Sequence, residues 1–344
     1  MYETALLIAG LVMAFLMAVS LGGNDAAEPT DCAVGAGVVS IKQAVTLFAI
    51  FCAVGALTQG YMVMKTIGKG IVHEISIAGA FACVTATVLW VNLVASRIGI
   101  DISVTHSIVG AVIGYGLAAY GWSGINHKVI YITALSWITS PLCSLALAFV
   151  LYKLIVYVLN RSKLTTNSSI IEKLFKYFLI GSLCFSAYAY GTNDIANATG
   201  VYVTIASKIG RMPDYTAMLF LAALGAIGTA VGGFFIGSKV ISTMAYRITR
   251  LNVIMGTAAE LSNALVVYLF TTIPYQLIGF GLPISTSLAS AGSLIGVGLA
   301  SGGRSGVNKS MIMKLTFFWV LNVPASAILS YLIYSLLKIT LGVV

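Results

Sequence analysis

Long apolar runs, separated by short polar or glycine-rich segments, follow one another along the whole chain. Each run has about 17 residues or more, which is the length that an α-helix needs to cross the hydrocarbon core of a bilayer. The pattern predicts membrane helices near residues 4–21, 43–64, 75–96, 102–120, 129–159, 174–190, 216–237, 253–273, 284–301 and 311–341.

The composition agrees with this pattern. The chain of 344 residues is 59% hydrophobic and only 8% charged, and its mean hydropathy is +1.00. An average soluble domain has about 25% charged residues. We therefore expect an all-α integral membrane protein that passes through the cell membrane several times, with the lipid bilayer as its surroundings.

The net charge is +9, and the basic residues lie mainly in short loops between the apolar runs. This charge therefore does not indicate nucleic-acid binding. The densest basic group consists of Arg161, Lys163, Lys173 and Lys176. Because basic residues favour the cytoplasmic side of a membrane, we expect the linker 161–174 to be cytoplasmic. Both termini then face outside if each half of the chain crosses an odd number of times.

The chain contains an internal repeat. Asn24-Asp25 matches Asn193-Asp194, at a sequence offset of 169 (193 − 24). A second alignment, at an offset of 182 (319 − 137), runs without a gap for about fifty residues and pairs Trp137 with Trp319. Small apolar residues match by chance in any membrane protein, but tryptophans at a constant offset rarely do.

These matches predict two homologous halves, residues 1–160 and 175–344, joined by the basic linker 161–174. Duplication of this kind is typical of secondary transporters, whose binding sites form between the halves. A channel can also be pseudo-symmetric, so the chemistry of the repeated segments has to decide between the two.

Carboxylates interrupt the apolar pattern. An ionised carboxylate at membrane depth is costly and usually marks a cation or proton pathway. In a helix, Asn24, Asp25 and Glu28 would share one face, as would Asn193, Asp194 and Asn197. These six residues are the predicted cation-binding residues, for Na⁺ or H⁺.

Pro29 lacks an N–H group, so in a continuous helix it would leave the carbonyl of Asp25 free for a cation. The competing interpretation is that all these polar groups only form hydrogen bonds between helices. For Glu260 the two interpretations have equal weight, and its role and that of Asp31 stay open.

Hydroxyl groups form the second repeated feature. One segment starts at Ser103, after an expected break at 99–101, and the other starts at Ser285, after an expected break at 279–283. Each precedes an apolar helix, so free backbone N–H groups and the positive end of a helix dipole are expected there. An oxyanion fits such a helix end. The predicted anion-binding residues are Ser103, Thr105, Ser285, Thr286 and Ser287.

Cysteine and histidine do not indicate a metal centre. The five cysteines and three histidines are dispersed, without ligand spacing. We therefore expect no transition-metal site. No nucleotide-binding motif and no pair of nucleophile and base stands out, so neither ATP-driven transport by this chain nor enzymatic activity is expected.

Anion-binding helix ends and cation-binding carboxylates, each present twice, together describe a symporter. At these residues the chain resembles the inorganic phosphate transporter (PiT) family over nearly its whole length. The segment from Gly191 to Gly200 resembles the family's second Asn-Asp signature, and the segment from Asn24 to Val39 resembles its first copy. The hydroxyl segments at Ser103 and Ser285 resemble the family's Pro-Val-Ser-Thr-Thr-His motifs.

The resemblance implies two inverted-topology repeats, about 10–12 membrane segments including two re-entrant helical hairpins, and commonly a homodimer. It also implies phosphate uptake coupled to a cation, with Na⁺ favoured over H⁺, and no resident cofactor. Carried over by position, Asp25 and Asp194 would contact phosphate as well as the cation. Glu28 and Asp31 depart from the family pattern, since the second copy has Asn197 and Gly200 there.

Phosphate and sulfate differ in one physical respect. Phosphate at neutral pH carries a proton that can be donated to a carboxylate such as Asp25 or Asp194, whereas sulfate has none. Phosphate is therefore the predicted substrate. The alternatives are a permease for sulfate or another oxyanion, and a cation channel.

Overall fold

The computed structural model describes residues 2–98, 102–162, 169–247, 251–303 and 309–342. In these ranges the chain is helical between its loops, apart from one antiparallel bridge between Val72 and Ile125. This confirms the all-α prediction. The expected helix break at 99–101 and the centre of the basic linker lie outside the described residues.

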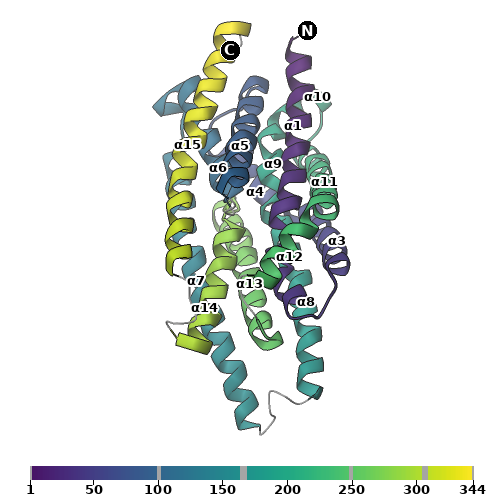
Figure 1. Ribbon diagram of the computed structural model, residues 1–344. Coiled ribbons are helices and arrows are strands. Elements are labelled where there is room, and N and C mark those ends of the chain that lie inside the picture. Colours follow the sequence, from purple (N-terminus) through teal and green to yellow (C-terminus); the bar gives the residue numbers. More distant parts are fainter. Residues whose placement is uncertain (1, 99–101, 163–168, 248–250, 304–308, 343–344) are drawn as a thin grey trace.

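The first half of the chain starts with a long helix and ends with a longer one (Figure 1). Its helices are α1 (Tyr2–Asp25), α2 (Asp31–Gly35), α3 (Ile41–Gln59), α4 (Tyr61–Lys65), the π-helical turn η1 (Thr66–Gly70), α5 (Ile77–Ile98), α6 (Val104–Tyr120), the 3₁₀ turn η2 (Trp122–Gly124) and α7 (His127–Arg161).

The second half also starts with a long helix and ends with a longer one. Its helices are α8 (Ser169–Asn193), α9 (Ile195–Thr199), the 3₁₀ turn η3 (Gly200–Tyr202), α10 (Val203–Gly210), α11 (Asp214–Gly232), the π-helical turn η4 (Gly233–Gly237), α12 (Ser238–Arg247), α13 (Val253–Ile278), α14 (Thr286–Gly302) and α15 (Lys309–Leu341). In both halves the first helix ends at an Asn-Asp motif. The starts of α6 and α14, and those of α7 and α15, are related by the second sequence offset (286 − 104 = 309 − 127 = 182).

Helices of one half pack against helices of the other half. Helix α6 packs on α15, and α14 packs on α7. Glycines make these contacts close: a Cβ atom added to Gly110 would lie 2.4 Å from the carbonyl oxygen of Val323, and one added to Gly292 would lie 2.4 Å from that of Pro141. The second sequence offset relates the two glycines to each other, and their two partners as well. The halves are therefore interlocked, and their contact surface lies along the helices that carry the hydroxyl segments.

The start of α1 and the end of α15 lie at one end of the helix bundle, and the end of α7 and the start of α8 lie at the opposite end (Figure 1). Helix α1 therefore starts at one end and α8 starts at the other. Six helical segments are long and apolar enough to cross a membrane: Glu3–Asp25, Ile41–Gln59, His127–Arg161, Asp214–Ser242, Val253–Ile278 and Thr316–Leu341. This number refers only to the described residues, and the wider count of about 10–12 segments stays a prediction.

Candidate cation and phosphate site between the halves

Each Asn-Asp motif lies where a long helix ends. Helix α1 ends at Asp25, and α8 ends at Asn193, directly before Asp194. The last turn of a helix carries carbonyl groups without helical partners and the negative end of the dipole. The carboxylates of Asp25 and Asp194, both buried, add full charges at these ends. The electrostatics therefore favour cations at both positions.

The prediction of a free carbonyl at Asp25 was wrong. The chain leaves the helix after Asp25 and forms a turn over residues 26–30, in which the N–H of Glu28 donates to the carbonyl of Asp25 at 3.1 Å. The hydroxyl of Thr30 donates to the carbonyl of Ala26 at 2.6 Å. The helix stops before Pro29 rather than continuing with a missing hydrogen bond, so Pro29 does not expose an oxygen ligand.

A buried hydrogen-bond network surrounds the second motif. The hydroxyl of Thr105, in the first turn of α6, donates to Oδ1 of Asp194 at 3.3 Å. The amide nitrogen of Asn197 lies 3.0 Å from the same carboxylate oxygen and 3.0 Å from the hydroxyl oxygen of Thr105. The hydroxyl segment of the first half therefore contacts the Asn-Asp motif of the second half.

The reciprocal contact exists at the first motif. Ser287, in the first turn of α14, donates a hydrogen bond to the carboxylate of Glu28. Ser287 corresponds to Thr105 by the second sequence offset, and Glu28 corresponds to Asn197 by the first. The two contacts therefore join corresponding positions, although Asn197 donates to Thr105 whereas Glu28 accepts from Ser287, and each brings the start of one helix beside residues that follow the end of another.

The serines at the helix starts have a capping role. Oγ of Ser103 accepts from the backbone N–H of His106, and Oγ of Ser285 accepts from that of Leu288, each at 3.3 Å. Both serines are buried, and each hydroxyl keeps its proton for donation to an anion. Thr286 is also buried, directly after Ser285.

The two asparagines of the motifs differ in their surroundings. The amide nitrogen of Asn193 donates to the hydroxyl of Thr271 at 2.7 Å and to the carbonyl of Leu282 at 2.9 Å. Asn193 thus holds the extended chain that leads to Ser285. Its amide oxygen has no hydrogen-bond partner among the described residues. Asn24 is only half-buried, and its amide lies 3.5 Å from Oγ of Ser20.

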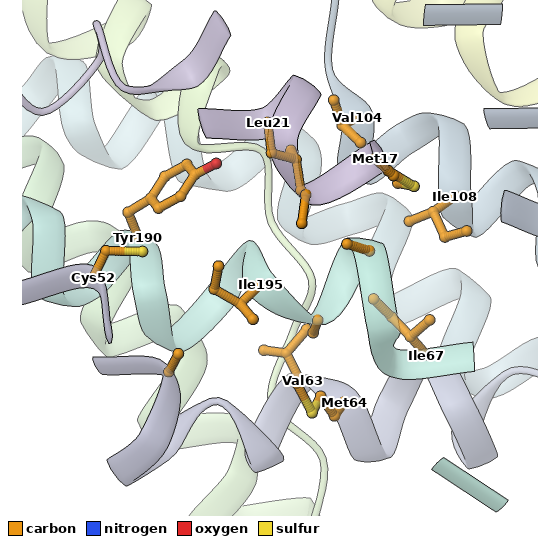
Figure 2. Close-up of a cluster of buried hydrophobic side chains, with 14 of the residues drawn as sticks. Met17, Leu21, Cys52, Val63, Met64, Ile67, Val104, Ile108, Tyr190 and Ile195 are labelled. Carbon is orange, nitrogen blue, oxygen red and sulfur yellow. The ribbon is translucent and has the colours of Figure 1, made fainter. Parts of the chain in front are cut away.

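Apolar side chains from both halves enclose the second motif. Figure 2 shows Ile195, in the first turn of α9, within a buried apolar cluster. The labelled members of the cluster are Met17 and Leu21 of α1, Cys52 of α3, Val63 and Met64 of α4, Ile67 of η1, Val104 and Ile108 of α6, and Tyr190 of α8. Because this shell excludes water, the polar groups next to it interact more strongly than they would at the surface.

One polar side chain in the site was not predicted from the sequence. The phenol of Tyr190 donates to Oδ2 of Asp25 at 3.4 Å, across the boundary between the halves. Tyr190 lies one helical turn before Asp194, and the backbone N–H of Asp194 donates to its carbonyl. Its position one turn before the motif was the available signal, but a tyrosine in an apolar run is more often part of the packing.

Comparison with known protein families gives a match that covers most of the chain. The sequence pattern of the phosphate transporter family matches residues 21–330. The chain belongs to the phosphate transporter family. It is therefore a multi-pass membrane transporter and not an enzyme.

Relatives of this transporter are similar to it over almost their whole length. A Pyrococcus furiosus protein named as a phosphate permease is 27% identical, over 99% of this chain and 98% of the relative. A Bacillus subtilis protein named as a low-affinity inorganic phosphate transporter is 29% identical, over 92% of both chains. A solved structure described as the sodium-dependent phosphate transporter matches with a TM-score of 0.83 and 29% identity, over 98% of this chain and 100% of that one.

Proposed function

We propose that this transporter takes up inorganic phosphate by symport with a cation, Na⁺ rather than H⁺, at the site between the two halves. The reciprocal contacts of Thr105 with Asp194 and Asn197, and of Ser287 with Glu28, carry this proposal. They bring two helix starts, which favour an anion, against two carboxylate motifs, which favour cations.

The charges explain why the two substrates would bind together. Asp25, Glu28 and Asp194 are all buried. A phosphate next to them would be repelled unless cations bound as well, and cations alone would lack the phosphate that completes their coordination. Binding of each substrate therefore favours binding of the other, which is the thermodynamic requirement for coupled transport.

Two observations support Na⁺ as the coupled cation. The site offers carboxylate, amide and hydroxyl oxygens, and a hard cation prefers oxygen ligands. The amide oxygens of Asn193 and Asn197 have no hydrogen-bond partner within the described ranges, although both side chains are fully buried. The structural relative with a TM-score of 0.83 is described as sodium-dependent.

The proposed mechanism is alternating access around this site. The first helices of the two halves start at opposite ends of the bundle, which supports an inverted relation between the halves 1–160 and 175–344. Helices α6 and α14 have 17 residues each and pack on the much longer α15 and α7, and this shortness supports hydroxyl-bearing helices that belong to re-entrant hairpins. The homodimer and the cytoplasmic position of the linker 161–174 are further parts of the proposal.

Phosphate uptake into proteoliposomes tests the proposal. An imposed inward Na⁺ gradient is expected to drive uptake, and an imposed pH gradient without Na⁺ is expected to drive much less. Excess sulfate should not compete. The variants Asp25→Asn and Asp194→Asn should lose most of the Na⁺-driven uptake, and full activity in both would contradict the assignment of the site. A Na⁺ current without phosphate would instead favour the cation channel.

A further inference from the structure

Three side chains of metal-ligand type lie together outside the phosphate and cation site. Asp31 and Cys32 begin α2, and Glu260 lies on α13 in the other half of the chain. One ligand atom from each of the three lies within 4.8 Å of the other two. The thiol of Cys32 lies within interaction range of both carboxylates.

All three side chains are withdrawn from solvent, and each of the two carboxylates has an oxygen without a hydrogen-bond partner among the described residues. Their exposed fractions are 8% for Asp31, 3% for Cys32 and 2% for Glu260. Oδ1 of Asp31 and Oε1 of Glu260 have no hydrogen-bond partner among the described residues. Buried polar atoms in native proteins nearly always have a partner, so two unsatisfied oxygens beside each other indicate a missing ligand.

A neighbouring polar pair supports this interpretation. Ser186 of α8 hydrogen-bonds Glu260 and also accepts from the amide nitrogen of Asn263 at 3.4 Å. Asn263 lies one turn after Glu260 on α13 and is 3% exposed, and its amide oxygen has no partner within the described ranges. Additional oxygen atoms are therefore available next to the three side chains.

The charge of the cluster indicates the charge of the ligand. Two carboxylates buried this close together cannot both stay ionised without a compensating charge. The ion pairs seen among the described residues are Lys69–Asp214, Lys176–Glu172 and Lys208–Glu74, and none of them includes Asp31 or Glu260. With the Cys32 thiol deprotonated as a metal ligand, the cluster carries up to three negative charges, of which a divalent cation offsets two and a monovalent cation only one.

The thiol then selects among divalent ions. Mg²⁺ and Ca²⁺ prefer oxygen ligands alone, whereas Zn²⁺ and neighbouring transition metals accept sulfur together with carboxylate. We propose that Asp31, Cys32 and Glu260 form a binding site for a divalent transition-metal ion of the Zn²⁺ class. The sequence suggested no such site, because Cys32 and Glu260 belong to opposite halves of the chain and become neighbours only in the fold.

Such an ion would join the two halves at a defined place. Helix α2 follows the turn that carries Glu28, and α13 carries Thr271, which holds Asn193. The metal would therefore fix the segment after the first motif against a helix that supports the second motif. This inference does not rest on the proposed phosphate symport.

Cobalt is a suitable probe, because Co²⁺ occupies zinc-type sites and a bound thiolate gives a near-ultraviolet charge-transfer band. The purified, untagged transporter is titrated with Co²⁺, followed by Zn²⁺. We expect the band to appear with saturation at one ion per chain and to disappear when Zn²⁺ is added. Cys32→Ala should abolish the band, and Glu260→Gln should weaken Co²⁺ binding at least about tenfold, since one charged ligand is lost.

Two variants serve as controls. Cys143→Ala removes an exposed cysteine on α7, and Asp25→Asn alters the phosphate and cation site; both should keep the band. If Glu260→Gln does not fold, Asp31→Asn is used in its place, with the same expected weakening. A wild-type protein without the band, or a band that persists in Cys32→Ala, would overturn the proposed metal site. Failure of Na⁺-driven phosphate uptake would leave the titration unaffected and would count only against the symport.

Discussion

The hydroxyl of Thr105 lies 3.3 Å from the carboxylate of Asp194, although the two residues belong to opposite halves of the chain. Helix α6 therefore begins at the Asn-Asp motif of the other half. If one half moves relative to the other, the hydrogen bond between Thr105 and Asp194 either breaks or the two residues move together. The same holds for Ser287 and Glu28.

We expect Thr105→Val to weaken phosphate uptake strongly. The substitution keeps the shape of the side chain and removes the hydroxyl shared by Asp194 and Asn197. A lost hydrogen bond to a charged group costs about 1.5–3 kcal/mol, which corresponds to a rise of about 10- to 150-fold in the KM for phosphate. Initial rates in proteoliposomes measure it. Thr139→Val is the matched control and should leave KM unchanged, because the hydroxyl of Thr139 bonds a carbonyl of its own helix, α7.

The close approach of α14 to α7 predicts a difference in stability between two glycine variants. A Cβ at Gly292 would collide with the backbone of Pro141, whereas a Cβ at Gly181 on α8 would meet no atom within 4 Å. Gly292→Ala should therefore destabilise the protein by about 1–3 kcal/mol. Gly181→Ala should leave stability unchanged or raise it slightly, because alanine favours helix. Thermal unfolding in detergent compares the two, and equal midpoints would contradict the packing described here.

The helical fold and the capping of α6 and α14 followed from the sequence because they depend on local pattern. Apolar runs predicted α1 and α7, and the second sequence offset agreed with the starts of α6 and α14. Ser103 and Ser285 cap these helices, as their place before an apolar run indicated. Each of these features is decided by residues within a few turns of one another.

One local turn and several contacts between distant residues did not follow from the sequence. The missing N–H of Pro29 was read within a continuous helix, but the chain turns after Asp25, so the carbonyl of Asp25 is occupied. Tyr190 reaches Asp25, which belongs to the other half of the chain. Cys32 meets Glu260 only because α2 packs on α13. No local pattern distinguishes these residues from ordinary packing.

We expect Tyr190→Phe to lower the apparent affinity for Na⁺. The phenol donates to Oδ2 of Asp25 and holds that carboxylate in place. A lost hydrogen bond to a charged group costs about 1.5–3 kcal/mol; this one is long, at 3.4 Å, so we expect the lower end of that range and a rise of about tenfold in the half-saturating Na⁺ concentration. Tyr202→Phe is the control, because Tyr202 is also buried and its hydroxyl has no hydrogen-bond partner among the described residues. A similar shift in both variants would contradict a specific role of Tyr190.

Glu28 distinguishes the first motif from the second, where Asn197 stands in its place, and this difference predicts an altered coupling ratio. The carboxylate of Glu28 is buried and receives a hydrogen bond from Ser287, so it adds a negative charge to the site that a cation or proton has to balance. Glu28→Gln keeps the size of the side chain and its hydrogen-bonding oxygen but removes this charge. We expect the number of cations moved per phosphate to fall by one.

The membrane potential at which net phosphate flux stops, measured in proteoliposomes at fixed gradients, reports this number. The converse variant Asn197→Asp adds a charge at the equivalent position of the second motif and is expected to shift that potential in the opposite direction. An unchanged coupling ratio and unchanged pH dependence in Glu28→Gln would show that Glu28 serves only as a hydrogen-bond acceptor for Ser287.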